Sequence, residues 1–115
     1  KDKKYFDAAI SDADYLFGRN ATGYCFVTGF GTKQVMHPHQ RLSAADGIDA
    51  PLPGFLAGGP NPGQQDIANV TSYPSKAADE SYTDDVNSYA SNEIAINWNA
   101  YLVGLLVTIE SELSK

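Results

Sequence analysis

The feature that most limits what this chain can fold into is the stretch from Ala21 to about Ser81, in which neither helical nor strand periodicity persists. Glycine and proline interrupt it too often for a helix of useful length. The glycines are Gly23, Gly29, Gly31, Gly47, Gly54, Gly58, Gly59 and Gly63, and the prolines are Pro38, Pro51, Pro53, Pro60, Pro62 and Pro74. Loops longer than roughly 12–15 residues are uncommon in compact domains unless they are functional. We therefore predict functional loops over about residues 20–84.

A helix is predicted before these loops, over about residues 3–18, because apolar residues recur there at three- and four-residue steps. Its apolar face consists of Tyr5, Phe6, Ala9, Ile10, Ala13, Leu16 and Phe17. Gly18 supplies a stop, since glycine readily adopts the positive-φ conformation that ends many helices.

A longer helix is predicted after the loops, over about residues 91–113. Its apolar face consists of Ile94, Ala95, Trp98, Leu102, Leu105, Leu106, Ile109 and Leu113. Ser91 and Asn92 are residue types whose side-chain oxygens cap helices, which places Glu93 in the first turn. The helix macrodipole alone favours a carboxylate there, by about 0.3–1 kcal/mol. Glu93 is therefore either a simple helix-end residue or a proton donor at the polar end of a buried helix.

Two helices alone cannot bury enough apolar surface to offset the ordering of so much loop, which costs roughly 1–2 kcal/mol per residue. With 115 residues, the chain is long enough for one modest domain. We expect it to be a piece of a larger domain whose other helices cover the two apolar faces.

The charge balance narrows the class of partner. The net charge of −6, from 14 acidic and 8 basic residues, argues against nucleic acid or an anionic membrane, because both would repel the chain. A neutral partner fits better. Cys25 is the only cysteine, so an internal disulfide is excluded. No apolar run reaches the roughly 18 residues that a membrane-spanning helix needs.

Two histidines and an arginine alternate with other residues around Pro38. Proline disfavours the helical conformation in the residue before it, and in an extended segment His37, His39 and Arg41 would share one side. Such a cluster could grip a sugar and orient carboxylates. His-x-His is also a metal-ligand spacing, but Arg41 adds a fixed positive charge and the sequence places no third ligand. A solvated pair of loop histidines is the third interpretation.

A second group of residues surrounds Glu93. It follows the pattern aromatic, x, Asp, four residues, aromatic, three residues, Glu, x, small, three residues, Asn, small, and the matching positions are Tyr82, Asp84, Tyr89, Glu93, Ala95, Asn99 and Ala100. The pattern resembles the signature around the catalytic acid of glycoside hydrolase family 9, the cellulase family of endo-β-1,4-glucanases. Alternatively, Asp84 and Asp85 only cap the following turn, and for Asp85 we expect that role.

The histidine segment resembles the other signature of the same family. The constrained positions are matched by Val27, Thr28, Gly31, Lys33, Pro38, His39 and Arg41. Cys25 departs from the signature, because that place usually holds Ser, Thr or Val, although a small thiol is a mild replacement. Residues 57–61, Ala-Gly-Gly-Pro-Asn, also look like a loop of these enzymes. The resemblance runs from about Asp14 to Leu113.

The resemblance implies an all-α fold, the C-terminal portion of an (α/α)6 barrel with long active-site loops. It also implies hydrolysis of internal β-1,4-glucosidic bonds in cellulose and related β-glucans, with inversion of configuration and Glu93 as general acid. In the family, the general base belongs to an Asp-Ala-Gly-Asp motif, which this chain lacks. The N-terminal part of the same catalytic domain would supply that base, so this chain alone is expected to be catalytically incomplete.

The resemblance assigns further roles. Asp84 and His39 are expected beside Glu93 in the catalytic centre. The residues expected to bind substrate are Arg41, Trp98, Tyr89 and His37. At helical spacing an aromatic side chain is as readily part of a core, so Trp98 has a second interpretation.

No cofactor is expected to be required for catalysis, no metal ligand is assigned in this chain, and any structural calcium would lie in the missing part. The expected partners are cellulose or a soluble β-1,4-glucan and the N-terminal part of the domain, with no nucleic acid and no membrane. The resemblance implies secretion to the extracellular space. Two alternatives are a non-catalytic glucan-binding remnant that keeps Trp98, His39 and Arg41, and a structural helical domain in which Glu93 is only a cap.

Overall fold

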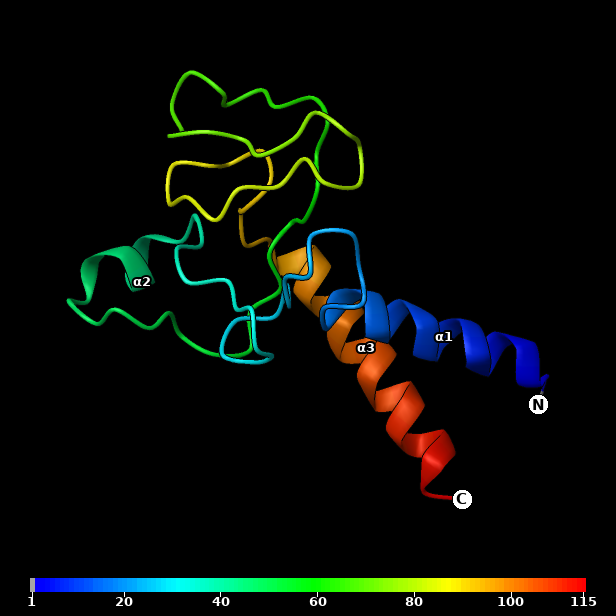
Figure 1. The fold of residues 1–115 in the computed structure, drawn as a ribbon. Coiled ribbons are helices and arrows are strands. Elements are labelled where there is room, and N and C mark those ends of the chain that lie inside the picture. Colours follow the sequence, from blue (N-terminus) through cyan, green and yellow to red (C-terminus); the bar gives the residue numbers. More distant parts are fainter. Residues whose placement is uncertain (1) are drawn as a thin grey trace.

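Three helices separated by long loops make up the fold (Figure 1). The computed structural model describes residues 2–115. Helix α1 spans Lys3–Leu16, α2 spans Arg41–Ala45 and α3 spans Ile96–Leu113. Helices α1 and α3 contact each other at one end of the molecule, and the loops gather at the other end. No β-strand forms within the described residues, where isolated β-bridges join the loops instead.

Helix α1 starts at a capping residue. The Asp2 carboxylate accepts a hydrogen bond from the Lys4 N–H at 3.2 Å. The helix ends at Leu16, slightly before the predicted end, and Gly18 then adopts φ = 119°. This positive φ, which glycine tolerates without a steric penalty, turns the chain into the loops.

Helix α3 begins later than the sequence predicts. Its N-cap is Ala95, which makes no side-chain capping bond, so Glu93 lies outside the helix and the predicted start near Ser91 is wrong. The side chains of Ser91 and Asn92 are buried among the loops instead of capping the helix. Glu93 and Ile94 form β-bridges with other loop residues. Tertiary pairing has overridden the local preference for a cap.

Helix α2 lies within the range that was predicted to be loop. Gln40 caps it, because its side-chain oxygen accepts a hydrogen bond from the Ser43 N–H at 2.7 Å. The chain turns again at Gly47, whose φ is 76°. A helix of 5 residues is too short for apolar periodicity to reveal.

Backbone pairing links loop segments that are far apart in the sequence. The bridges join Cys25 to Gln34, Val27 to Leu56, Ala57 to Ile94 and His39 to Glu93. The Thr28 hydroxyl reinforces them, since it donates to the Leu52 carbonyl at 2.7 Å and accepts from the Phe55 N–H at 2.9 Å. The segment that carries Glu93 therefore belongs to one connected network of loops.

The core lies where the loops meet α3. It is formed by Cys25, Phe26, Val27, Val35, Leu56, Ala57, Tyr82 and Leu102. The rings of Phe26 and Tyr82 pack with centroids 5.0 Å apart. Because most of these residues belong to the loops, burial of apolar surface orders segments that have no periodic structure.

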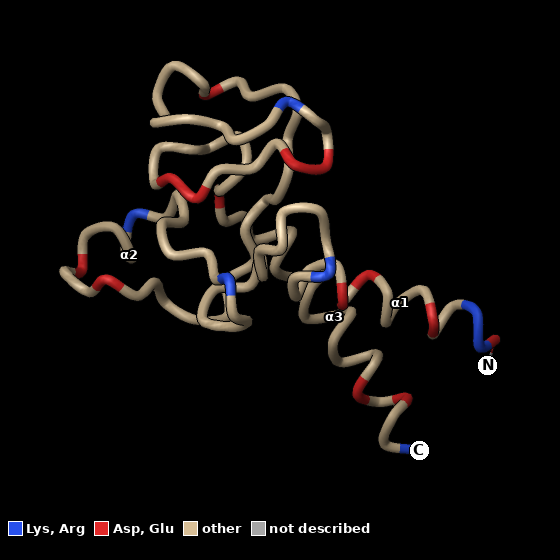
Figure 2. The backbone as a smooth tube through the Cα atoms, in the orientation of Figure 1, with Lys and Arg blue, Asp and Glu red and all other residues tan. Residues whose placement is uncertain are grey.

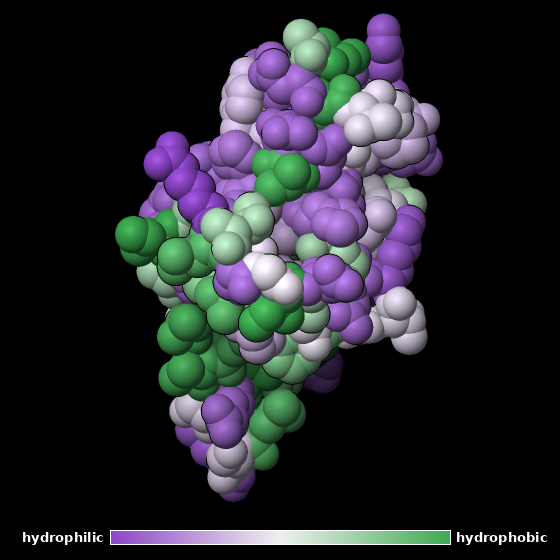
Figure 3. Space-filling model, turned by 90° about the vertical axis from the view of Figure 1, so that its left-hand side faces the viewer, coloured by the Kyte–Doolittle hydropathy of each residue, from purple (hydrophilic) through white to green (hydrophobic). Residues whose placement is uncertain are grey.

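Both long helices leave apolar surface uncovered. Ile96, Tyr101 and Leu113 of α3 are 92%, 79% and 70% exposed, and α1 has no fully buried residue. Figure 3 shows hydrophobic residues gathered toward the end of the molecule that carries the helices. Uncovered apolar surface of this kind marks a contact face. It agrees with the expectation that other helices of a larger domain pack here.

Two surface properties bear on the class of partner. Figure 2 shows Lys and Arg at scattered positions, and they form no cluster in the part of the chain that the structure describes. Among residues 2–115, no helix is long and apolar enough to cross a membrane.

Candidate active site

Glu93 lies in the extended stretch immediately before α3, between two loops. The Gly58 N–H donates to the Glu93 carbonyl at 3.0 Å, and the His39 N–H donates to the preceding carbonyl, that of Asn92, at 2.9 Å. The Glu93 side chain is exposed and has no hydrogen-bond or ion-pair partner among residues 2–115. The main chain is thus held from two sides, and the carboxyl group is left available for a ligand.

His39 is placed directly beside Glu93 by a parallel β-bridge. Its Nδ1 lies 2.6 Å from the Val86 carbonyl oxygen. Because a carbonyl can only accept, Nδ1 carries a proton, and Nε2 has no hydrogen-bond partner among residues 2–115. The Tyr89 ring meets the imidazole edge to face with centroids 6.5 Å apart. The structure therefore brings together three predicted site residues, Glu93, His39 and Tyr89.

Asp84 holds the histidine loop. Its carboxylate accepts hydrogen bonds from the N–H groups of Met36 and His37, both at 2.8 Å, and from Asn92 Nδ2 at 3.2 Å. Asp85 caps its own turn, as predicted, by accepting from the Asn87 N–H at 2.8 Å. These bonds make Asp84 an anchor for the loop that carries the two histidines.

Asn92 is a functional candidate that the sequence indicates only as a possible helix cap. The side chain is fully buried, and Nδ2 donates to the His37 carbonyl at 2.7 Å. Its Oδ1 accepts a hydrogen bond from the Tyr82 hydroxyl. Burial, followed by the nearby charge of Asp84, raises the pKa of Tyr82, which keeps that hydroxyl protonated as a donor. The only sequence signal for Asn92 was its place just before Glu93, which suited a helix cap equally well.

The prediction that His37, His39 and Arg41 share one side of an extended segment is wrong. Gln40 caps α2, so Arg41 is the first residue of a helix and not a continuation of an extended segment. Its guanidinium is exposed and has no ion-pair partner among the described residues. Within residues 2–115, no group of three or more His, Cys, Asp and Glu side chains is arranged to hold a metal ion.

Trp98 lies in the first turn of α3 against the loop at Gly58. A Cβ at Gly58 would lie 3.1 Å from the indole ring, so the ring packs almost directly on the glycine backbone. Trp98 also borders an apolar hollow between the long helices, together with Leu16 and Leu102. These contacts are those of a packing residue, and its substrate-binding role stays a prediction.

A second buried polar cluster lies beside the segment that leads into Glu93. The fully buried Asp66 carboxylate accepts from the Tyr73 hydroxyl at 2.6 Å and from the Ala90 N–H at 2.8 Å. Burial by itself would raise the pKa of Asp66, but the hydrogen bonds outweigh it and hold the pKa below its usual value. No sequence motif marked Asp66, because its partners are distant in the chain.

The acidic side chains around the histidine loop differ in whether their carboxyl groups are engaged. Hydrolysis of a glycosidic bond needs a carboxylic acid that protonates the departing oxygen and a second carboxylate on the other side of the sugar. Glu93 has the exposure that the first role requires. The carboxylates of Asp84 and Asp85 are both engaged by main-chain N–H groups. Of the acidic residues 84, 85 and 93, Glu93 is therefore the one whose carboxyl group has no hydrogen-bond partner among the described residues.

Comparison with known proteins points in the same direction. The model of the family described as Glycosyl hydrolase family 9 matches residues 1–106. A xyloglucan-specific endo-beta-1,4-glucanase of Bacteroides ovatus, BoGH9A, is 59% identical over 107 residues, which are 93% of this chain and 18% of the relative. Endoglucanase D of Acetivibrio thermocellus is 42% identical over 86% of this chain and 13% of the relative.

A solved structure gives the same match in three dimensions. A single mutant of a thermostable endoglucanase from Alicyclobacillus acidocaldarius superposes with a TM-score of 0.84 at 44% sequence identity, over 90% of this chain and 20% of that chain. The chain spans about a fifth or less of the length of these three proteins.

Proposed function

Because this chain belongs to glycosyl hydrolase family 9, we propose that it is the part of a β-1,4-glucanase that carries the general acid. The chain is all-α and forms the C-terminal portion of an (α/α)6 barrel with long loops. The proposed reaction is hydrolysis of internal β-1,4-glucosidic bonds in cellulose and related β-glucans. The observation that carries the proposal is the exposed carboxyl group of Glu93, which has no partner among the described residues, on a main chain held beside His39.

In the proposed mechanism, Glu93 protonates the oxygen that leaves with the departing sugar. Nε2 of His39, which has no partner among the described residues, forms a hydrogen bond with a sugar hydroxyl, while the Val86 carbonyl fixes the ring. The Tyr89 ring, which lies edge to face with the imidazole, limits its movement. Asp84 contributes to catalysis by holding the histidine loop in place, because its carboxylate accepts hydrogen bonds from main-chain N–H groups of that loop.

Arg41, His37 and Trp98 are proposed to bind substrate. The first two present side chains without partners among the described residues, so their donors are available to sugar hydroxyls. Trp98 is 36% exposed, which leaves part of its ring for contact with a sugar.

The general base is proposed to come from the rest of the catalytic domain. An inverting reaction needs a second carboxylate about 6.5–9.5 Å from the acid, with space for the attacking water between them. The partner of this chain is therefore the N-terminal part of its own domain, together with the glucan. We propose action outside the cell, because a polymeric glucan is hydrolysed where it is found, and no cofactor for this reaction.

A second substrate, xyloglucan, is favoured by one observation. The relative named as xyloglucan-specific is 59% identical to this chain over 107 aligned residues, whereas Endoglucanase D is 42% identical over 99. Xyloglucan has the same β-1,4-glucan main chain with sugar branches. Assays should therefore compare carboxymethylcellulose and xyloglucan.

The test uses the whole protein and the variant Glu93→Gln. Loss of a general acid should lower kcat on a natural glucan by roughly 10²–10⁴-fold. The loss should be much smaller on a dinitrophenyl cellobioside, whose leaving group needs no proton. Glu110→Gln, an exposed glutamate on α3, is the matched control and should behave as wild type. NMR of the first product should show inverted anomeric configuration.

Other outcomes separate the alternatives. Binding of glucan without release of reducing sugar by the wild type would favour a non-catalytic glucan-binding remnant. If the wild type neither binds nor hydrolyses glucan, that result would favour a structural helical domain. Equal activity of wild type and Glu93→Gln on carboxymethylcellulose would exclude Glu93 as the acid.

A further inference from the structure

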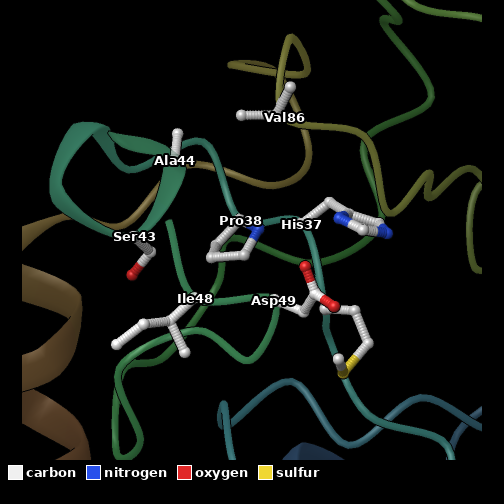
Figure 4. Close-up of a pocket in the computed structure, with 8 residues that line it drawn as sticks. His37, Pro38, Ser43, Ala44, Ile48, Asp49 and Val86 are labelled. Carbon is white, nitrogen blue, oxygen red and sulfur yellow. The ribbon is translucent and has the colours of Figure 1, made fainter. Parts of the chain in front are cut away.

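A hollow of about 450 Å³ lies beside the proposed active site, and of its lining residues only His37 and Val86 have a role in the mechanism above. Met36, Pro38, Ile48 and Val86 provide apolar walls, and His37 and Asp49 also line the hollow, with the His37 ring directed away from Ser43 and Ile48 (Figure 4). Small-molecule sites are concave, mostly apolar and furnished with a few polar groups. The composition of this hollow matches that description.

Three polar side chains line the hollow, and one of them, Ser43, accepts a hydrogen bond from the Leu52 N–H at 3.2 Å. Neither the His37 imidazole nor the Asp49 carboxylate has a hydrogen-bond or ion-pair partner in the described part of the chain. The main chain of His37 is nevertheless held firmly, with its N–H on Asp84 and its carbonyl on Asn92. A donor and an acceptor are thus presented over an apolar surface. A sugar ring, with C–H faces and hydroxyl edges, is complementary to such a surface.

The hollow adjoins the catalytic centre through shared residues. The Val86 carbonyl binds His39 Nδ1, and the Val86 side chain lines the hollow. His37 and His39 flank Pro38 in the same loop. A ligand in the hollow would therefore lie to one side of a glucan chain that passes Glu93 and His39.

We propose that this hollow binds a monosaccharide branch of a β-1,4-glucan, such as the xylose of xyloglucan, and so favours branched over unbranched substrates. The inference rests on the proposed function. Asp49 accepts hydrogen bonds from the hydroxyls of the branch, and Ile48 and Val86 contact its apolar face. The high identity to a relative named as xyloglucan-specific agrees with this assignment.

The test measures kcat/KM of the whole protein on two oligosaccharides of equal main-chain length, one xylosylated and one unbranched. Asp49→Ala removes the acceptor, and Ala44→Phe fills the hollow from α2, where Ala44 lines it. Each should lower kcat/KM for the xylosylated substrate about tenfold, equivalent to about 1.4 kcal/mol, and change the value for the unbranched substrate less than about twofold.

Two matched variants control for indirect effects. Asp79→Ala removes an exposed loop acid elsewhere, and Ala45→Phe adds the same ring to the next position of α2. Both should leave the ratio between the two substrates unchanged. An equal fall on both substrates, or no fall on either, would overturn the branch site while leaving the proposed function intact. Absence of hydrolysis of any β-1,4-glucan by the wild type would overturn the proposed function itself.

Discussion

The His39 N–H donates a hydrogen bond to the Asn92 carbonyl at 2.9 Å, which joins the histidine loop to the residue before Glu93. The Asn92 side chain binds the same loop a second time, since Nδ2 donates to the His37 carbonyl at 2.7 Å and to Asp84 at 3.2 Å. One buried residue thus contacts the histidine loop through both its main chain and its side chain. The separation of Glu93 and His39 depends on these bonds.

Replacing Asn92 by Ala should therefore damage catalysis more than binding. The variant leaves the buried Tyr82 hydroxyl without its acceptor and the His37 carbonyl without the Asn92 donor, at a cost of roughly 1–3 kcal/mol. In the whole enzyme we expect kcat to fall about tenfold or more, with KM changed less than about threefold. Gln64→Ala is the control, because Gln64 is also buried and its amide also donates two hydrogen bonds to loop acceptors. Equal losses of kcat in both variants, compared at equal folded fraction, would show that Asn92 has only a structural role.

Arg41→Ala should also lower kcat more than it raises KM, if its contacts with substrate strengthen in the transition state. We expect a fall in kcat of about tenfold to a hundredfold, consistent with loss of a charged hydrogen bond. Arg19→Ala is matched in charge and exposure, but that guanidinium is paired with Asp14 at 2.9 Å on the surface. Steady-state kinetics on a soluble glucan would measure both. A rise in KM alone would assign Arg41 to simple substrate retention.

Gly58→Ala should disturb the acid-bearing segment through Trp98. The new Cβ would lie 3.1 Å from the indole and 3.3 Å from the Ser91 carbonyl oxygen, so a neighbour must move. Overpacking of this kind typically costs about 1–3 kcal/mol in the free energy of unfolding. Trp98→Phe removes the ring atoms in question. The double variant should therefore lose less stability than the sum of the single variants, and strict additivity in urea unfolding would contradict the contact.

Asp66→Asn should lower stability in a pH-dependent way. The pKa of Asp66 is depressed in the folded protein relative to about 3.9 in an unfolded chain. The ionised carboxylate therefore stabilises the fold above about pH 4, and this contribution is lost as the pH falls through the folded-state pKa. At pH 7 we expect the variant to lose about 1–3 kcal/mol in the free energy of unfolding. The difference from wild type should shrink on acidification.

Urea unfolding of the whole protein between about pH 7 and about pH 3 would follow this change. Asp79→Asn, at an exposed position, should stay within about 0.5 kcal/mol of wild type throughout. A constant loss for Asp66→Asn at every pH would indicate a packing defect instead of a lost ionised hydrogen-bond acceptor.

The fold was predictable where the signal was local and periodic. Both long helices could be recognised from apolar residues three and four positions apart, and the Asp85 turn from its residue type. The start of α3 could not, because Ser91 and Asn92 suit a cap as well as a buried loop contact. Glu93, His39 and Tyr89, which the sequence pattern singled out, lie together, and their roles in catalysis and binding stay predictions. The position of Arg41 in a helix was missed, since a helix of 5 residues leaves no period to detect.

The sequence by itself determined the two helices, the extent of the loops between them and the two motifs that identify the family. Only the tertiary structure decided that Glu93 is extended, that Asp84 anchors the histidine loop, and that Asn92 is hydrogen-bonded to both Asp84 and that loop. The physical reason is the separation in sequence between the residues that interact. Helical periodicity and capping involve residues within about one turn of each other. The bonds that build this site join residues 47, 48 and 55 positions apart, and they form only when the loops fold onto one another.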